Sequence, residues 1–416
     1  MLTHGNPGES EAVHSPSAVQ SKIQHSLDRQ LENQPKDVRY CTWCVVSNQR
    51  PRIVFDSEGV CSACRFAHEK KTTIDWKDRN RQLEELCNQF RRNDGRYDVI
   101  VPCSGGKDSS SVAHKLKHKY GMHPLTVTWA PFAYTEIGWQ NYQAFIKSGF
   151  SNLLCWPNGH LHRKLSRIAF EAVGDAWQPF AFGQMAYAFH IALQHGIKLV
   201  FFGENGEAEY GGSPKNNHRP FMPLEDWSDL YFKGVTVDDM ITWGQERSLI
   251  SPADYDPSDL QFYKPPKPDV LRKEGIQMHW FSYYDRWIPQ ENYYYCAEHT
   301  GFQANRDGRS EGTYSKYASL DDRLDGFHYY LAYLKFGIAR ATSDAAHEVR
   351  DGHITRDEAV ALVRRFDGEF PKTYFADFLE YLSISEEEFW RIADGYRPPH
   401  LWEKVDGAWV LKHRVT

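Results

Sequence analysis

The sequence predicts an α/β protein with a doubly wound parallel sheet, preceded by a small cysteine-rich unit and followed by a helical region. Short apolar runs alternate with helical periodicity between residues 97 and 202, which is typical of βαβ units. A glycine-rich loop, residues 104–110, directly follows the first of these runs. Two CxxC pairs lie before the alternation, within residues 41–64. Together these features predict a nucleotide-binding sheet with an attached metal-binding ribbon.

The first 35 residues are polar and lack the apolar stretch of a signal peptide. We therefore expect residues 1–35 to form a flexible tail and the protein to be cytoplasmic. No run reaches the roughly 18 apolar residues of a membrane-spanning helix, so we expect no membrane span. The net charge of −6 does not indicate nucleic acid as a partner, because such proteins usually carry a basic surface.

The cysteine-rich unit spans residues 36–71. Its four cysteines follow the pattern CxxC, sixteen residues, CxxC, and are Cys41, Cys44, Cys61 and Cys64. Two such pairs can place four thiolates around one tetrahedral Zn²⁺, in a site with no open position and hence a structural role. Residues 52–60 between the pairs predict a short hairpin. Two disulfides or an iron–sulfur cluster are the alternatives to a zinc ribbon.

The alternating region predicts four strands, each followed by a helix or a turn. The short apolar runs are typical of buried parallel strands. The predicted strands are residues 97–103, 123–129, 152–156 and 198–202. The predicted helices are residues 75–93, 109–120, 137–149, 160–173 and 183–195.

The alternation weakens over residues 210–325, where Pro, Tyr and Trp interrupt it. We expect long substrate loops in this segment. Residues 326–416 predict a helical C-terminal region, with a strong helix over 326–341. Two capping boxes, which begin at Thr355 and Ser385, predict two further helix starts.

The glycine-rich loop carries the strongest functional signal. Its residues Ser104, Gly105, Gly106, Lys107, Asp108, Ser109 and Ser110 lie between a strand and a helix. Glycines let backbone N–H groups converge on a pyrophosphate, and the helix start adds partial positive charge. Lys107 can neutralise phosphate charge, and Asp108 can cap the helix or hold Mg²⁺. The pattern differs from the Walker A loop, and it indicates an ATP site.

The remainder of an ATP site is expected at the carboxyl ends of the other strands. Trp129 ends the second strand and is a candidate to cover the adenine. Gly203 ends the fourth strand, and Glu204 and Glu207 follow it as candidate carboxylate ligands of Mg²⁺ and catalytic groups. An ordinary polar loop at a strand end is the alternative interpretation.

The combination of motifs resembles the N-acetyl sugar amidotransferases, which are PP-loop ATP pyrophosphatases of bacterial surface-glycan synthesis. The resemblance rests on the CxxC ribbon, on VIVPCSGGKDSS (residues 99–110) and on FFGENGEAEYGG (residues 201–212). A C-terminal block from Tyr314 to Arg340 adds to it. The likeness covers roughly residues 38–395. It implies an adenine nucleotide alpha hydrolase-like sheet, with residues 72–325 as the PP-loop domain.

The resemblance implies that ATP adenylates the oxygen of a sugar N-acetyl group and that ammonia then displaces AMP, leaving an acetamidino group. It implies lipopolysaccharide O-antigen synthesis, with a UDP-2,3-diacetamido-hexuronic acid favoured as substrate over a nonulosonic acid. A glutaminase needs a nucleophilic cysteine at its N-terminus or in a Gly-x-Cys-x-Gly turn, and this chain has neither. We therefore expect ammonia from a separate glutaminase. The family resemblance also implies a barrel-type subunit as a candidate ammonia conductor.

Candidates for the sugar site are polar residues of the later segments. They are Glu209, Tyr210, Lys316, Asp322 and Arg340. Lys316 or Arg340 could bind a sugar carboxylate or a diphosphate. Each has an alternative interpretation as a solvated or ion-paired structural residue.

Two other functions are compatible with some of these motifs. A tRNA-thiolating PP-loop enzyme also combines a zinc ribbon with this loop. It requires catalytic cysteines, for which Cys103 and Cys155 are candidates, and a basic RNA-binding face, which the acidic pI of about 6.3 does not favour. A zinc-ribbon interaction protein without catalysis leaves the phosphate loop unexplained.

Overall fold

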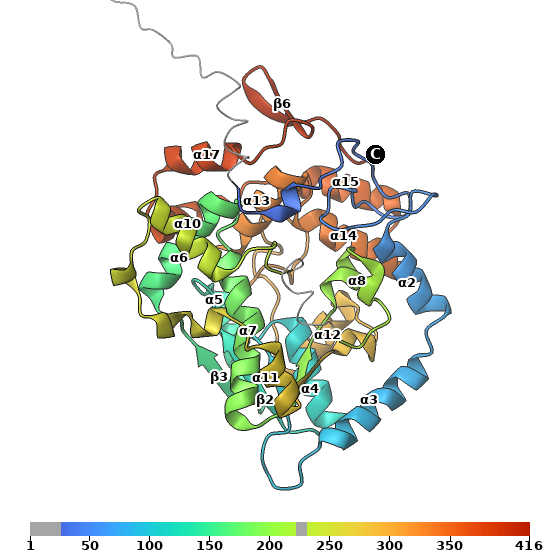
Figure 1. The fold of residues 1–416 in the computed structure, drawn as a ribbon. Helices are drawn as coiled ribbons and strands as arrows, with labels where there is room; N and C mark the ends of the chain where they lie inside the picture. Colours follow the sequence, from blue (N-terminus) through green and yellow to red (C-terminus); the bar gives the residue numbers. More distant parts are fainter. Residues whose placement is uncertain (1–25, 222–230) are drawn as a thin grey trace, which may run out of the picture.

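The computed structural model describes residues 26–221 and 231–416, and a five-stranded parallel sheet forms its centre (Figure 1). The strand order is β3-β2-β1-β4-β5, and every neighbouring pair is parallel. The strands are β1 (Val99–Pro102), β2 (Pro124–Trp129), β3 (Asn152–Cys155), β4 (Leu199–Phe202) and β5 (Gln277–Trp280). The four predicted strands and the α/β class are confirmed. The fifth strand lies in the segment where the sequence pattern loosens, and it was not predicted.

Alternate residues of the central strands pack into two different cores, so both faces of the sheet are covered. Ile100 and Val200 pack with α7 (Gln178–His195). Val101 and Phe201 pack with α4 (Lys107–His118) on the other face. This doubly wound arrangement places the loops after β1, β2 and β4 at one edge of the sheet, where ligands bind in open parallel sheets.

The predicted helices of the α/β region are present, with boundaries that shift by a few residues. They are α3 (Trp76–Phe90), α4, α5 (Glu136–Lys147), α6 (Gly159–Val173) and α7, which starts five residues earlier than expected. Further helices in the segment after β4 are α8 (Gly206–Tyr210), α10 (Val237–Glu246), α11 (Pro268–Glu274) and α12 (Pro289–His299).

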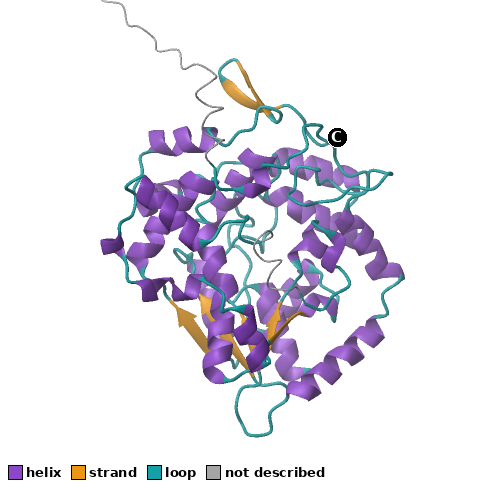
Figure 2. Ribbon diagram, in the orientation of Figure 1, coloured by secondary structure: helices purple, strands orange, loops and turns teal. Residues whose placement is uncertain are grey.

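The C-terminal region is helical, as predicted, and ends in a hairpin that was not predicted. Its helices are α13 (Asp325–Phe336), α14 (Arg340–Asp351), α15 (Arg356–Phe366), α16 (Phe375–Leu382) and α17 (Glu386–Asp394). The single helix expected over 326–341 ends instead at Gly337, whose φ of 68° terminates α13. The antiparallel strands β6 (Trp402–Val405) and β7 (Ala408–Leu411) lie at the opposite end of the molecule from the sheet (Figure 2).

The segment preceding the cysteines is partly incorporated into the fold. Residues 1–25 of the predicted tail lie outside the described residues, whereas residues 26–35 pack against the C-terminal region. Asp28 is 2% exposed, and its carboxylate pairs with the Lys335 ammonium at 2.8 Å. The prediction of a tail through residue 35 is wrong for residues 26–35, because polar composition does not reveal a buried ion pair.

The cysteine-rich unit packs between the C-terminal helices and the loop that follows β4. An antiparallel bridge between Phe55 and Cys61 closes the predicted hairpin. Helix α2 (Ser62–Thr72) begins at the second CxxC pair and contacts α8 and α14. The ribbon therefore reaches the edge of the sheet where a site is expected. Among the described helices, none is long and apolar enough to cross a bilayer.

Candidate functional site

The phosphate loop leaves the carboxyl end of β1 and turns into α4. Gly105 has a φ of 86°, and a Cβ at this position would lie 2.6 Å from the Cα of Tyr142 in α5. Only glycine tolerates both the conformation and this contact. Gly106 is the N-cap of α4 and offers no side chain to the free N–H groups of the first turn. Those groups remain available to an anion.

Lys107 and Asp108 are held together at the start of α4. The Lys107 ammonium pairs with Oδ2 of Asp108, and the lysine is 8% exposed. Oδ1 of Asp108 accepts hydrogen bonds from the Trp287 indole N–H at 3.0 Å and from the Asn292 amide at 2.9 Å. Both donors come from the segment that contains α12, which therefore fixes the carboxylate beside the loop.

The three serines of the loop have different partners. Ser104 donates a hydrogen bond to the carboxylate of Asp321. The Ser109 hydroxyl lies 3.4 Å from the carbonyl oxygen of Gly106, and the buried Ser110 hydroxyl lies 3.6 Å from the Cys103 thiol. Ser104 and Ser109 lie at the loop surface, whereas Ser110 is part of the packing beneath it.

Glu204 follows β4 and interacts electrostatically with the phosphate loop. Burial, and next the nearby Asp108 carboxylate, raise the pKa of Glu204 to about 7, while Lys107 lowers it. Two carboxylates that repel each other in this way are a suitable pair for a divalent cation. The structure thus brings together four of the predicted residues, Lys107, Asp108, Gly203 and Glu204, at one edge of the sheet.

Two other glutamates of the same loop are structural anchors of the ribbon. The Glu207 side chain is fully buried, pairs with Arg52 at 2.8 Å and accepts the Ser213 N–H. The Glu209 carboxylate pairs with the Lys70 ammonium at 2.5 Å. Ion pairs with cations of the ribbon favour a structural role for both carboxylates over the predicted catalytic role of Glu207 and substrate role of Glu209.

Three more predicted residues lie outside this constellation. Asp322 is 4% exposed, and its carboxylate accepts the Phe132 and Leu324 N–H groups, so it fastens the loop after β2 rather than facing a ligand. Lys316 is exposed and lies 4.9 Å above the Tyr293 ring. Trp129 is 5% exposed in the core, so covering an adenine would require it to leave that packing.

Comparisons with known proteins identify the C-terminal part of the chain. Residues 311–416 match the family described as "LPS biosynthesis protein WbpG-like, C-terminal domain". We call these residues, a quarter of the chain, the WbpG-like domain because of this similarity. The sequence-based resemblance to a lipopolysaccharide-biosynthesis family is confirmed for this domain.

Two other proteins are similar to parts of the chain. An uncharacterized protein, MJ1599 of Methanocaldococcus jannaschii, is 27% identical over 88 residues, which are 21% of this chain and 31% of that protein. The match thus spans about a third of that relative. An NH3-dependent NAD synthetase from Campylobacter jejuni has a TM-score of 0.27 and 13% identity, over 49% of this chain and 94% of the synthetase chain.

The WbpG-like domain and the phosphate loop line one cavity. Its lining includes Lys107, Trp287 and Tyr210, together with Arg340 and His347 of the WbpG-like domain. The His347 ring makes edge contacts with the rings of Tyr210 and Trp287, at centroid distances of 4.8 and 4.9 Å. The predicted residues Tyr210 and Arg340 therefore lie beside Lys107, although they are far apart in the sequence.

Several residues in or next to this cavity were not predicted. Trp287 and Asn292 carry no recognisable motif, and only the fold brings them to Asp108. The polar residues of α14 did carry a signal, because their spacing places them on one face of the helix. They are Arg340, Asp344, His347, Glu348 and Asp351.

The four cysteines of the ribbon form a buried cluster. One sulfur from each lies within 4.8 Å of the other three, and all four are buried. Arg350 of the WbpG-like domain lies 3.9 Å from the Cys44 sulfur and donates to the Glu209 carbonyl at 2.9 Å. The cluster is compatible with zinc and is connected to the loop that follows β4.

The lone cysteines do not have the features of reactive thiols. Burial raises the pKa of Cys103, and it raises the pKa of Cys155 to about 11 and of Cys296 to about 12. A thiol in such surroundings stays protonated at neutral pH. This environment does not favour the tRNA-thiolating alternative.

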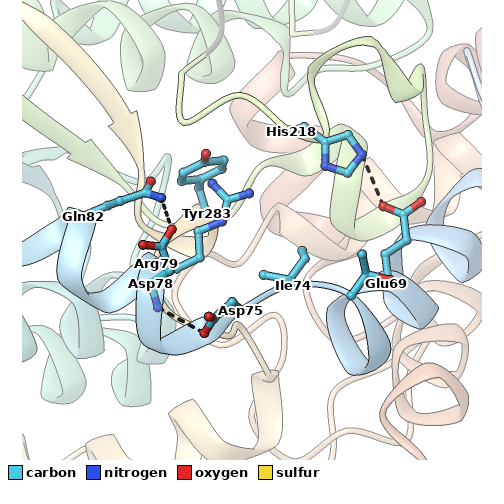
Figure 3. Close-up of a pocket in the computed structure, with 9 residues that line it drawn as sticks. Glu69, Ile74, Asp75, Asp78, Arg79, Gln82, His218 and Tyr283 are labelled. Carbon is cyan, nitrogen blue, oxygen red and sulfur yellow. Dashed lines mark hydrogen bonds and ion pairs between the residues drawn. The ribbon is translucent and has the colours of Figure 1, made fainter.

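A second cavity, of about 300 Å³, lies between α2 and α3 (Figure 3). Arg79 stacks on the Tyr283 ring at 3.5 Å, and His218 pairs with Glu69 at 3.2 Å across its mouth. None of the predicted site residues lines it. The cavity next to Lys107 is therefore the candidate site.

Proposed function

We propose that the protein is an ATP-dependent amidotransferase that converts the N-acetyl group of a sugar into an acetamidino group, with release of AMP and pyrophosphate. The observation that carries this proposal is the shared cavity. It joins a phosphate loop at the carboxyl edge of a parallel sheet to a WbpG-like domain of lipopolysaccharide biosynthesis. Phosphate chemistry and a glycan-modifying family thus meet in one place.

The chemistry needs both halves of this cavity. The amide oxygen is a poor leaving group, so it first attacks the α-phosphorus of ATP, and pyrophosphate departs. The N–H groups of residues 104–110 and the Lys107 ammonium stabilise the negative charge that develops on the phosphates. Ammonia then attacks the activated carbon, and the C–O bond to AMP breaks. Arg340, which pairs with Asp344, is the candidate partner of the anionic group of the sugar at the opening of the cavity.

Two metal ions fit the residues present. Asp108 and Glu204 are the residues that would hold Mg²⁺, since oxygen ligands suit this ion and the two carboxylates repel each other without one. Bound there, Mg²⁺ would offset phosphate charge. The four buried thiols would hold Zn²⁺ in a closed, structural site that braces the loop after β4.

The substrate and partners follow from the family resemblance. We propose a UDP-2,3-diacetamido-hexuronic acid as the first substrate to test, with a nonulosonic acid as the second. We propose that ammonia comes from a separate glutaminase, with a barrel-type subunit as a candidate ammonia conductor. The buried or half-buried cysteines of the described chain support an external source of ammonia.

The test is a reaction of the purified protein with ATP, Mg²⁺, ammonium and the UDP-diacetamido-hexuronic acid. We expect AMP and pyrophosphate, with a sugar product lighter by the mass difference between O and NH. The same reaction with Lys107→Ala is the control and should give no product. Formation of ADP and orthophosphate would contradict the proposal, as would an unchanged sugar with each of the two substrates.

A further inference from the structure

The cavity beside Lys107 is too small for a nucleotide sugar. The volume within which the centre of a water-sized molecule can lie is about 20 Å³. Roughly 10–15 Å³ is enough for one such molecule. The occupant of this part of the site is therefore of the size of water or ammonia, and the sugar must lie at its opening.

One wall of the cavity is a row of carboxylates on α14. Asp344, Glu348 and Asp351 are spaced by four and three residues, so they lie on one face of the helix. The row spans roughly 10 Å, from a rise of about 1.5 Å per residue. Exposed His353 and Lys107 of the phosphate loop line the same cavity. The row therefore shares its cavity with an exposed residue and with the phosphate loop.

Asp344 pairs with Arg340, whereas Glu348 makes no ion pair among the described residues, and the cations Lys70 and Arg350 lie near Asp351. The ion pair of Asp344 has a length of 3.1 Å, and Asp344 also accepts the Thr313 hydroxyl at 2.6 Å. Glu348 is contacted only weakly by the Tyr317 hydroxyl, at 3.4 Å. Burial raises the pKa of both Glu348 and Asp351. Glu348 is consequently a better proton acceptor than an exposed carboxylate.

A buried imidazole also faces the cavity. His347 is 6% exposed, and within the described part of the chain its Nε2 has no hydrogen-bond partner. Burial, and next the Arg350 guanidinium, hold the pKa of His347 well below its usual range, so the ring is neutral. Its Nε2 can accept or donate one hydrogen bond, depending on the tautomer. A small N–H compound would satisfy it.

The remaining walls are aromatic. Trp287, Tyr210 and Tyr317 line the cavity together with the carboxylates. Carboxylates and ring faces bind a cation, and a cation of one heavy atom fits the space. A water molecule fits equally well by size, but the Glu348 carboxylate, which makes no ion pair among the described residues, favours a cation over a neutral molecule.

We propose that this cavity is the ammonium site of the enzyme, in which Glu348 and Asp351 attract NH₄⁺ and Glu348 accepts its proton. The resulting NH₃ forms the C–N bond with its lone pair, and the electrons of the C–O bond leave with AMP. Nε2 of His347 orients the nitrogen, and Lys107 marks the end that faces the phosphates. This inference rests on the proposed amidotransferase function.

The experiment measures AMP formation against ammonium chloride concentration at saturating ATP and UDP-diacetamido-hexuronic acid. We expect Asp351→Asn and Glu348→Gln each to raise the KM for ammonium at least about tenfold, which corresponds to roughly 1.4 kcal/mol, with the KM for ATP unchanged. Glu298→Gln, an exposed carboxylate on α12 outside the cavity, is the matched control and should leave the ammonium KM unchanged. Methylammonium, which is larger, should be a poor substitute.

Sugar-dependent exchange of pyrophosphate into ATP without ammonium separates the two levels of the proposal. If Asp351→Asn and Glu348→Gln show normal pyrophosphate exchange and an unchanged KM for ammonium, the ammonium site is overturned but the amidotransferase function is not. Absence of exchange in the unmodified protein would overturn the amidotransferase function and this inference together. If Glu348→Gln fails to fold, the Asp351→Asn variant decides the question by itself.

Discussion

The loop after β1 and the loop after β4 end at the same edge of the sheet, yet their acidic residues have different roles. Asp108 in the first loop is held by neutral donors from Trp287 and Asn292 and by its neighbour Lys107. Glu207 and Glu209 in the second loop are instead paired with cations of the ribbon. A carboxylate at a strand end is thus available for chemistry only when no distant cation neutralises it.

The largest effect we expect is on stability, at the Glu209 anchor. Lys70→Met removes the ammonium that pairs with Glu209, and both side chains are nearly fully buried. Breaking a buried pair leaves an unpaired charge and typically costs about 3–5 kcal/mol of the free energy of unfolding. Urea denaturation monitored by circular dichroism measures this loss.

An exposed ion pair provides the control for this comparison. Arg81→Ala breaks the exposed pair with Asp78 and should cost no more than about 1 kcal/mol. Equal losses for the two variants would show that the second loop is not anchored through Glu209.

The next effect is on activity, at the first loop. Lys107→Ala removes the ammonium at the start of α4, and we expect kcat to fall by about 10²–10³-fold, the loss typical of a group that stabilises developing charge. The measurement is pyrophosphate release under saturating ATP. Glu207→Gln should instead change kcat far less, and a similar loss in both variants would remove the distinction between the loops.

The surroundings of the first loop can be inferred from the sequence better than those of the second, for a physical reason. Residues 104–110 form a contiguous motif, and its conformation is set locally by Gly105 and by the helix that follows. The roles of Glu207 and Glu209 depend on Arg52 and Lys70, more than a hundred residues away. Such pairing cannot be inferred from the residue types of one loop.

The same contrast applies to the fold. Three of the four predicted strands, β1, β2 and β4, are buried on both faces, and the edge strand β3 still carries a short apolar run. β5 was missed, since it begins at exposed Gln277 and includes His279. His279 is accommodated only because its Nδ1 bonds with the Tyr284 hydroxyl at 2.8 Å. The residues that α14 contacts across the cavity could not be predicted either, although the spacing of its polar residues was present in the sequence.

Glu204 should give an intermediate effect that depends on pH. Its folded pKa of about 7 lies above the ordinary value of 4.5, so the carboxyl group is protonated below pH 7 and ionised above it. If the ionised form binds Mg²⁺, the affinity for Mg²⁺ should rise as pH increases through about 7. Glu204→Gln should lower kcat by about tenfold, which corresponds to roughly 1.4 kcal/mol in activation free energy. It should also remove the pH dependence of the affinity for Mg²⁺.

The linked effect on stability has the opposite sign. Between the unfolded and folded pKa values the folded state binds more protons than the unfolded state, so this group destabilises the fold as pH rises from about 4.5 to about 7. Glu204→Gln should therefore flatten that part of the stability profile in the absence of Mg²⁺. A profile identical to that of the unmodified protein would mean that Glu204 is neither buried nor coupled to Asp108.

The smallest effect is expected at Lys316, which lies outside both loops. Its side chain is exposed and lies above the rings of Tyr293 and Tyr294. Exposed substitutions usually change free energies by no more than about 0.5 kcal/mol, so Lys316→Ala should leave kcat/KM for the sugar within about twofold. Arg340→Ala, a substitution at the cavity, should lower kcat/KM for the sugar much more. A large loss at Lys316 would place the anionic group of the sugar on the outer surface, and the cavity beside Lys107 would then serve ammonia alone.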